Sequence, residues 1–185
     1  MASGLLAVDV QVDFCEGGSL AVEGGGEVAR RLTSHVQQHR GDYALVVASR
    51  DWHIDPGPHF AADPDFRESW PVHCVAGETG SAFHPAFDAA LIDAVVSKGE
   101  HAAAYSAFEG HTDDGRSLAS LLADAGITEL DVAGIATDYC VRASALDAVR
   151  AGLDVRLLTD LVAGVAPESS AAAVDELRAA GVEIA

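Results

Sequence analysis

Basic residues are scarce in this chain of 185 residues, which has 11 Lys and Arg against 29 Asp and Glu and a formal net charge of −18. So acidic a surface repels phosphate backbones and anionic lipid headgroups. The composition therefore argues against nucleic acid and against a membrane surface as partners. It leaves a small neutral or cationic molecule open as the ligand.

Cysteine is also rare, and three residues, an odd number, do not form a disulfide framework in a chain of this size. No apolar run reaches the 18 residues of a transmembrane helix, and the first residues lead into an apolar run without the basic region of a targeting peptide. We therefore expect a cytoplasmic protein. The length, with 49% hydrophobic residues, predicts one globular domain over residues 1–185.

Lysine occurs once, as Lys98, beside ten arginines. A chain that otherwise uses arginine does not need one lysine for solubility, so this ammonium group is a candidate for a functional role. Lysine is a compact point charge whose pKa shifts readily when it is buried. The glycine-rich stretch 16–26 lacks both the GxGxxG and the Walker pattern, so no phosphate site is predicted there.

The chain alternates between apolar runs and amphipathic helices. Strands are predicted at residues 5–8, 43–49, 93–97, 129–135, 154–159 and 182–184, and helices at 27–40, 85–92, 117–125, 138–150 and 167–179. Four helices end in a glycine that leads into a strand, at Gly41, Gly126, Gly152 and Gly181. This repeated unit predicts an α/β fold with a mostly parallel sheet and helices on both faces.

Cys140 follows the apolar strand predicted at residues 129–135, in the first turn of the helix predicted at 138–150. Open parallel sheets bind ligands at the carboxyl ends of their strands. Helix-terminal N–H groups favour a thiolate, which points to a nucleophilic cysteine of low pKa. The alternative is a small buried thiol without chemistry, because free cysteine is among the most buried residue types.

Asp9 and Lys98 also follow predicted strands. If these strands and the strand before Cys140 are neighbours, the three side chains open onto one crevice. The carboxylate could then take the thiol proton as general base, while the ammonium stabilises the thiolate. The alternative is a buried Asp–Lys pair with a purely structural role.

The segment 50–85 has little periodicity and holds four of the eight histidines and both tryptophans. A structureless loop of this length in a small domain is usually functional. Asp51, His53, His59 and His73 offer one carboxylate and three imidazoles, which suit Zn²⁺ or Fe²⁺ with positions left for water or substrate. The alternative is that these histidines cap proline-rich turns.

Five motifs, in order through nearly the whole chain, resemble the nicotinamidases of the isochorismatase-like cysteine hydrolases. They are Asp9-x-Gln11-x-Asp13-Phe14, Asp51-x-His53-x5-His59, Ser69-Trp70-Pro71-x-His73-Cys74, Lys98-Gly99 and Gly134-Ile135-Ala136-Thr137-Asp138-x-Cys140-Val141. The motif around the cysteine indicates only the superfamily. The loop with Asp51 and its histidines is what indicates nicotinamidases.

The resemblance implies a three-layer α/β/α sandwich around a six-stranded sheet, and a role for each matching residue. It places the catalytic triad on Asp9, Lys98 and Cys140, and one divalent transition metal (Zn, Fe or Mn) on Asp51, His53, His59 and His73. It assigns the oxyanion to the N–H groups of Ala136 and Cys140, with a cis peptide before Ala136. Substrate-binding residues would be Phe14, Trp70, Tyr105, Ile135 and Tyr139. Close relatives often have histidine where this chain has Tyr139, so the change is expected to affect substrate fit.

The activity implied is hydrolysis of nicotinamide to nicotinate and ammonia through a cysteine thioester, with pyrazinamide as a further substrate. Two alternatives stay open. One is an amidohydrolase of the same superfamily that acts on another small amide. The other is a degenerate module that binds a metal or a partner, although an intact triad argues against it. Metal identity and any homo-oligomer stay open.

Overall fold

The computed structural model describes residues 2–185 and contains one six-stranded sheet with the strand order β3-β2-β1-β4-β5-β6. The strands are β1 (Ala2–Val8), β2 (Leu45–Asp51), β3 (Ala94–Lys98), β4 (Ile127–Ile135), β5 (Asp154–Ala163) and β6 (Glu183–Ile184). Every neighbouring pair is parallel, so all carboxyl ends lie at one edge. The predicted α/β fold is confirmed, and the sheet is entirely parallel.

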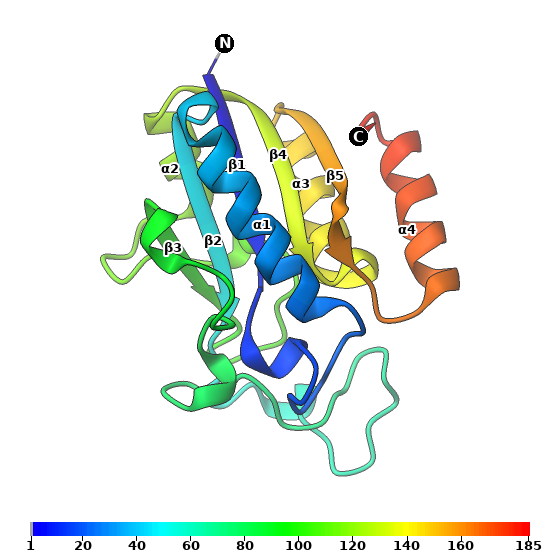
Figure 1. Ribbon diagram of the computed structural model, residues 1–185. Coiled ribbons are helices and arrows are strands. Elements are labelled where there is room, and N and C mark those ends of the chain that lie inside the picture. Colours follow the sequence, from blue (N-terminus) through cyan, green and yellow to red (C-terminus); the bar gives the residue numbers. More distant parts are fainter. Residues whose placement is uncertain (1) are drawn as a thin grey trace.

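Helices cover both faces of this sheet (Figure 1). The α-helices are α1 (Gly25–His39), α2 (Leu118–Asp124), α3 (Arg142–Arg150) and α4 (Pro167–Ala179). Short 3₁₀ turns lie at Val12–Phe14, Arg40–Asp42, Gly57–His59, Thr79–Ser81, Ala89–Leu91 and Ala107–Glu109, and a π-helical turn lies at Thr137–Val141. No helix in residues 2–185 is long and apolar enough to cross a membrane.

The alternation of side chains along β1 divides the core into two layers. Leu5 and Ala7 face the layer with α1, where Leu32 is buried. Leu6 and Val8 face the opposite layer, which contains residues of α2, α3 and α4. Because both faces are covered, β1 is apolar from Leu5 to Val8, as is typical of a parallel sheet.

Two predicted helices differ from the structure. The helix predicted at 85–92 is wrong, since only the 3₁₀ turn Ala89–Leu91 forms there. The Thr33 hydroxyl of α1 donates to the carbonyl of Ala86 (2.8 Å) and accepts from the N–H of Asp88 (2.9 Å), so these groups are not available to a helix. The helix predicted at 138–150 begins only at Arg142, because the π-helical turn precedes it.

Candidate active site

Asp9, Lys98 and Cys140 come together at the carboxyl edge of the sheet, with 0%, 1% and 7% of their surfaces exposed. Lys98 Nζ lies 2.9 Å from Asp9 Oδ2 and 3.6 Å from Cys140 Sγ. The strand before Cys140 neighbours β1, as the prediction required, but β3 is separated from β1 by β2. The long lysine side chain therefore reaches past the end of β2.

Asp51 stands at the end of β2, where it meets Lys98. Its Oδ1 accepts a short hydrogen bond from Lys98 Nζ, a contact that the sequence did not predict. The lysine is thus shared between two buried carboxylates. Burial by itself lowers the pKa of Lys98, but Asp51 and Asp9 outweigh it and hold this pKa well above its usual range. Lys98 is a fixed cation.

The thiol of Cys140 differs from the low-pKa group expected at a helix start. Burial raises its pKa well above the usual value, and the nearby Asp9 and Asp51 raise it further, against the lowering effect of Lys98. The cysteine rests as a thiol and needs a base. Asp9 Oδ2 has no hydrogen-bond partner among residues 2–185 beyond its ion pair, whereas Oδ1 accepts from Ser49 Oγ at 2.7 Å. Because Oδ1 is already bonded to Ser49, Oδ2 is the oxygen that would take a proton.

The chain around Cys140 has a geometry that its motif makes possible. Gly134 has φ 120°, and a Cβ there would lie 2.1 Å from the carbonyl oxygen of Val8, so only glycine lets β4 approach β1 this closely. The peptide bond between Ile135 and Ala136 is cis, as the resemblance implied. The N–H of Val141 then donates to the carbonyl of Ala136 (3.1 Å) across the π-helical turn that holds Cys140.

The four predicted metal ligands gather beside this cluster. The ligand atoms of His53, His59 and His73 lie within 4.8 Å of one another, and all three side chains are buried. Asp51 Oδ2 lies 3.6 Å from His53 Nε2 and 3.9 Å from His73 Nε2. One carboxylate thus faces Lys98 with one oxygen and the histidines with the other.

The donor atoms of this centre fit a divalent metal. Nδ1 of His53 bonds the carbonyl of Gly99 (2.6 Å) and Nδ1 of His73 that of Pro71 (2.7 Å). A carbonyl only accepts, so both Nδ1 atoms carry the proton and both Nε2 atoms keep a lone pair. Buried His53 Nε2 and His59 Nδ1 have no hydrogen-bond partner among the described residues. Burial and His53 lower the pKa of His59 to about 4, which keeps it in the neutral form that binds metals.

Gln11 and Asp13 hold the segment that carries the predicted metal ligands against the end of β1. The Gln11 amide accepts from the N–H of Asp51 (2.8 Å) and donates to its carbonyl (2.8 Å), as a neighbouring strand would. Asp13 Oδ2 accepts from the N–H of Cys74 (2.7 Å), next to His73. Both residues belong to the first motif, but their roles were not predicted from the sequence.

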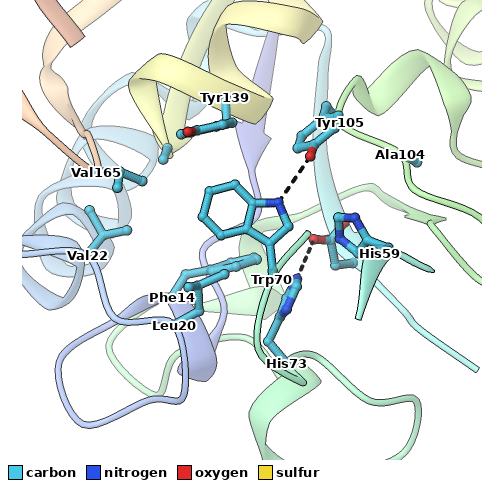
Figure 2. Close-up of a pocket in the computed structure, with 12 residues that line it drawn as sticks. Phe14, Leu20, Val22, His59, Trp70, His73, Ala104, Tyr105, Tyr139 and Val165 are labelled. Atoms are coloured by element: carbon cyan, nitrogen blue, oxygen red, sulfur yellow. Dashed lines mark hydrogen bonds and ion pairs between the residues drawn. The ribbon is translucent and has the colours of Figure 1, made fainter. Parts of the chain in front are cut away.

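A pocket adjoins the metal centre (Figure 2), while Asp9, Lys98 and Cys140 are not part of its lining. Its lining includes Asp51, His59 and His73 of the metal centre, Ala136 beside the nucleophile, and the predicted residues Phe14, Trp70, Tyr105 and Tyr139. Ile135, predicted as a substrate-binding residue, instead packs in a core cluster with Val28 and Cys74 and is not part of the lining. Sequence reasoning missed four lining residues, which are Leu20, Val22, Ala104 and Val165. Single small or aliphatic residues in loops carry no chemical signature.

The chain matches the family model described as "Isochorismatase domain" over residues 3–185. It is 52% identical over 180 residues to the nicotinamidase/pyrazinamidase of Mycobacterium tuberculosis, and the aligned region covers 97% of this chain and 96% of that protein. Among solved structures, it is similar to the pyrazinamidase of Pyrococcus horikoshii in complex with zinc (36% identity, TM-score 0.86, 100% of this chain and 99% of that one). It is also similar to PnC1 from L. infantum in complex with nicotinate (36% identity, TM-score 0.87, 100% and 92%).

Proposed function

This chain belongs to the isochorismatase family, and we infer that it hydrolyses nicotinamide to nicotinate and ammonia. The observation that carries this inference is one pocket lined by His59, His73 and Asp51, with Asp51 also bonded to Lys98, which lies beside the buried thiol of Cys140. The thiol suits a carboxamide carbon, and a metal suits a ring nitrogen. Pyrazinamide has both groups and is expected to be a second substrate.

In the first half of the reaction, Asp9 takes the proton of Cys140 and the thiolate attacks the carboxamide carbon. Lys98 lies 3.6 Å from the sulfur and stabilises its negative charge. We assign the oxyanion to the N–H groups of Ala136 and Cys140, and one donor of this kind typically contributes about 3 kcal/mol. Asp9 returns the proton to the leaving nitrogen, so ammonia departs and a thioester remains.

In the second half, Asp9 takes a proton from water as the water attacks the thioester carbonyl. The C–S bond breaks, nicotinate leaves, and Cys140 regains a proton from Asp9. The carboxylate thus alternates between base and acid. Its burial raises its pKa above the ordinary value, which suits a group that must both accept and give up protons.

The metal centre would orient the substrate. Asp51, His53, His59 and His73 would hold one divalent ion, and this ion would bind the pyridine nitrogen when present. Phe14 and Trp70, which line the same pocket, would lie against the faces of the ring. The sequence-based predictions of a cytoplasmic location and of no nucleic-acid partner stay predictions.

The test is ammonia release from nicotinamide by the purified protein. We expect Cys140→Ala to fall to background, because no other cysteine has a lysine beside it. Cys15→Ala is the matched control and should keep most of the activity, since Cys15 is buried and its pKa is raised to about 11 by burial. Undiminished turnover by Cys140→Ala would end the assignment of the nucleophile. No ammonia from the unmodified protein loaded with metal would end the proposed function.

A further inference from the structure

The nucleophile and the inner wall of the substrate pocket are buried in this structure. Phe14, Trp70, Ala136 and Cys140 have 8%, 4%, 8% and 7% of their surfaces exposed. A pyridine carboxamide cannot reach a nucleophile that is this buried unless part of the wall moves. The question is which segment opens and what holds it shut.

Residues 61–69, which we term the tip loop, do not line the pocket themselves but lead directly into its wall residue Trp70, and they have few ties to the rest of the protein. The loop lies between two predicted metal ligands, His59 and His73, and is largely exposed. It protrudes at the carboxyl edge of the sheet (Figure 1). Its base is fixed by a hydrogen bond from the N–H of Trp70 to the carbonyl of His59 (2.8 Å) and one from Ala61 to the carbonyl of Trp70 (3.0 Å).

The tip loop is well ordered within itself. Asp65 Oδ1 accepts hydrogen bonds from the N–H groups of Arg67, Glu68 and Ser69, each at 2.9 Å. The N–H of Phe66 donates to the carbonyl of Ser69 at 3.1 Å. Because these bonds are all internal, the loop can swing about its base without breaking them.

Two tyrosines tie the tip loop to the body of the protein. The Tyr139 hydroxyl donates to the carbonyl of Phe66, and the Tyr105 hydroxyl donates to that of Arg67, both at 3.3 Å. Among residues 2–185, no other hydrogen bond or ion pair joins the loop to the protein beyond its base. Tyr139 precedes Cys140, so this tie connects the loop directly to the turn that carries the nucleophile.

Trp70 is held by the same two tyrosines (Figure 2). Its Nε1 donates to the Tyr105 hydroxyl at 3.1 Å, and its ring meets that of Tyr139 edge-on, with centroids 5.0 Å apart. The Tyr105 hydroxyl therefore serves both the loop and the substrate wall. The only hydrogen bond of the Tyr139 hydroxyl among the described residues goes to the loop, so removing that oxygen cuts one tie.

We propose that Tyr139 is a specificity-determining residue whose hydroxyl latches the tip loop, and through it the adjoining Trp70 of the pocket wall, and thereby disfavours carboxamides larger than a single ring. This rests on the proposed function of the site. With the latch closed, the Trp70 ring is held against Tyr139, and a second fused ring needs Trp70, together with the loop that precedes it, to move.

The experiment compares Tyr139→Phe with the unmodified protein, both loaded with metal. The first arm measures amide hydrogen exchange in the tip loop. The second measures kcat/KM for nicotinamide and for quinoline-3-carboxamide, which adds one fused ring. We expect faster exchange at the N–H groups of Phe66 and residues 67–69, and a rise of about 3- to 10-fold in the preference for the quinoline, since one hydrogen bond is lost. Tyr43→Phe is the matched control, because the Tyr43 hydroxyl bonds Asp131 at the opposite end of the sheet.

Each outcome has one meaning. Exchange that is unchanged in Tyr139→Phe would overturn the latch, and faster exchange with an unchanged substrate preference would overturn the role in specificity. The same changes in Tyr43→Phe would mean a general loosening and would also overturn the proposal. If the unmodified protein does not hydrolyse nicotinamide, the proposed function fails and the specificity claim with it, while the exchange arm still tests the latch.

Discussion

Two clusters of buried charge lie at opposite ends of the same sheet, and they are built differently. At the carboxyl edge, Lys98 lies between Asp9 and Asp51, and none of the three side chains is more than 5% exposed. At the amino end, Asp131 of β4 is also buried, but its partner Arg156 keeps 46% of its side chain in solvent. The cation of the first cluster is fully buried, whereas that of the second remains in contact with solvent.

The two clusters also differ in how completely their polar atoms are paired. Asp131 accepts from Tyr43 (2.6 Å) and twice from Arg156 (2.8 and 2.6 Å). Of the buried side-chain atoms without a hydrogen-bond partner in residues 2–185, three lie at the carboxyl edge and only Ser170 Oγ lies elsewhere; the three are Asp9 Oδ2, which has its ion pair with Lys98, His53 Nε2 and His59 Nδ1. Unpaired buried atoms destabilise a fold, so their concentration at one edge indicates binding and catalysis.

The largest effect is expected from removing the cation of each cluster. Lys98→Met should abolish ammonia release and lower the free energy of unfolding by about 3–5 kcal/mol, because it leaves two buried carboxylates unpaired. Arg156→Met should cost less, about 1.5–3 kcal/mol, because Asp131 keeps its hydrogen bond from Tyr43, and it should leave activity unchanged. Urea unfolding and ammonia release measure both. Equal losses of stability in the two variants would contradict the distinction between the clusters.

Metal removal should give the next largest effect, and only at the carboxyl edge. Metal at 100 times its dissociation constant adds about 2.7 kcal/mol to the free energy of unfolding, so a chelator should lower the melting temperature. The double variant His53→Ala, His59→Ala should not respond to chelator, and elemental analysis should find it metal-free. His101→Ala, at an exposed position, is the control and should respond like the unmodified protein. A chelator that shifts none of the three proteins would contradict the metal centre.

The sequence predicted what depends on local pattern. Helix α4 was predicted to the residue, because Pro167 marks its first turn and Gly181 follows its end. The places of Asp9, Lys98 and Cys140 followed from the rule that the carboxyl ends of parallel strands share an edge. The contact between Lys98 and Asp51 was not predicted, because it depends on β2 lying between β1 and β3, and strand order is not encoded in local pattern.

The remaining misses have the same origin in tertiary contacts. Nothing in the segment 85–92 shows that Thr33, more than 50 residues earlier, would bond its backbone. The raised pKa of Cys140 results from its depth of burial, which a helix-start argument ignores. Val165 lines the pocket because the carboxylate of Asp138 accepts from its N–H at 2.9 Å, a contact between residues 27 positions apart.

A smaller effect is expected from Tyr43→Phe at the amino end. The variant removes one hydrogen bond to the charged Asp131, which keeps its ion pair with Arg156. We expect a loss of about 1.5 kcal/mol in the free energy of unfolding, at the low end for bonds to charged groups. For a chain of this length, the melting temperature should fall by roughly 3–6 °C. Turnover of nicotinamide should not change, and a drop in kcat would contradict the separation of the two ends.

The smallest effect concerns pH and His35, whose Nε2 lies 2.8 Å from the Tyr43 hydroxyl. That hydroxyl donates its one proton to Asp131, so His35 Nε2 carries a proton and donates, and only Nδ1 can titrate. In the folded state, burial lowers the pKa of His35, and the nearby His39 and Arg156 lower it further. Together they outweigh Asp131 and Asp42, which raise it. The unfolded chain, with an ordinary value of about 6.5, therefore takes up the proton first as the pH falls. This histidine thus contributes a loss of stability that begins as the pH falls through about 6.5 and stops below its folded pKa.

His35→Gln keeps a donor for Tyr43 but cannot titrate, so urea unfolding between about pH 7.5 and 5.5 should give a shallower decline in the free energy of unfolding than in the unmodified protein. Parallel curves for the two proteins would show that His35 binds protons equally in both states.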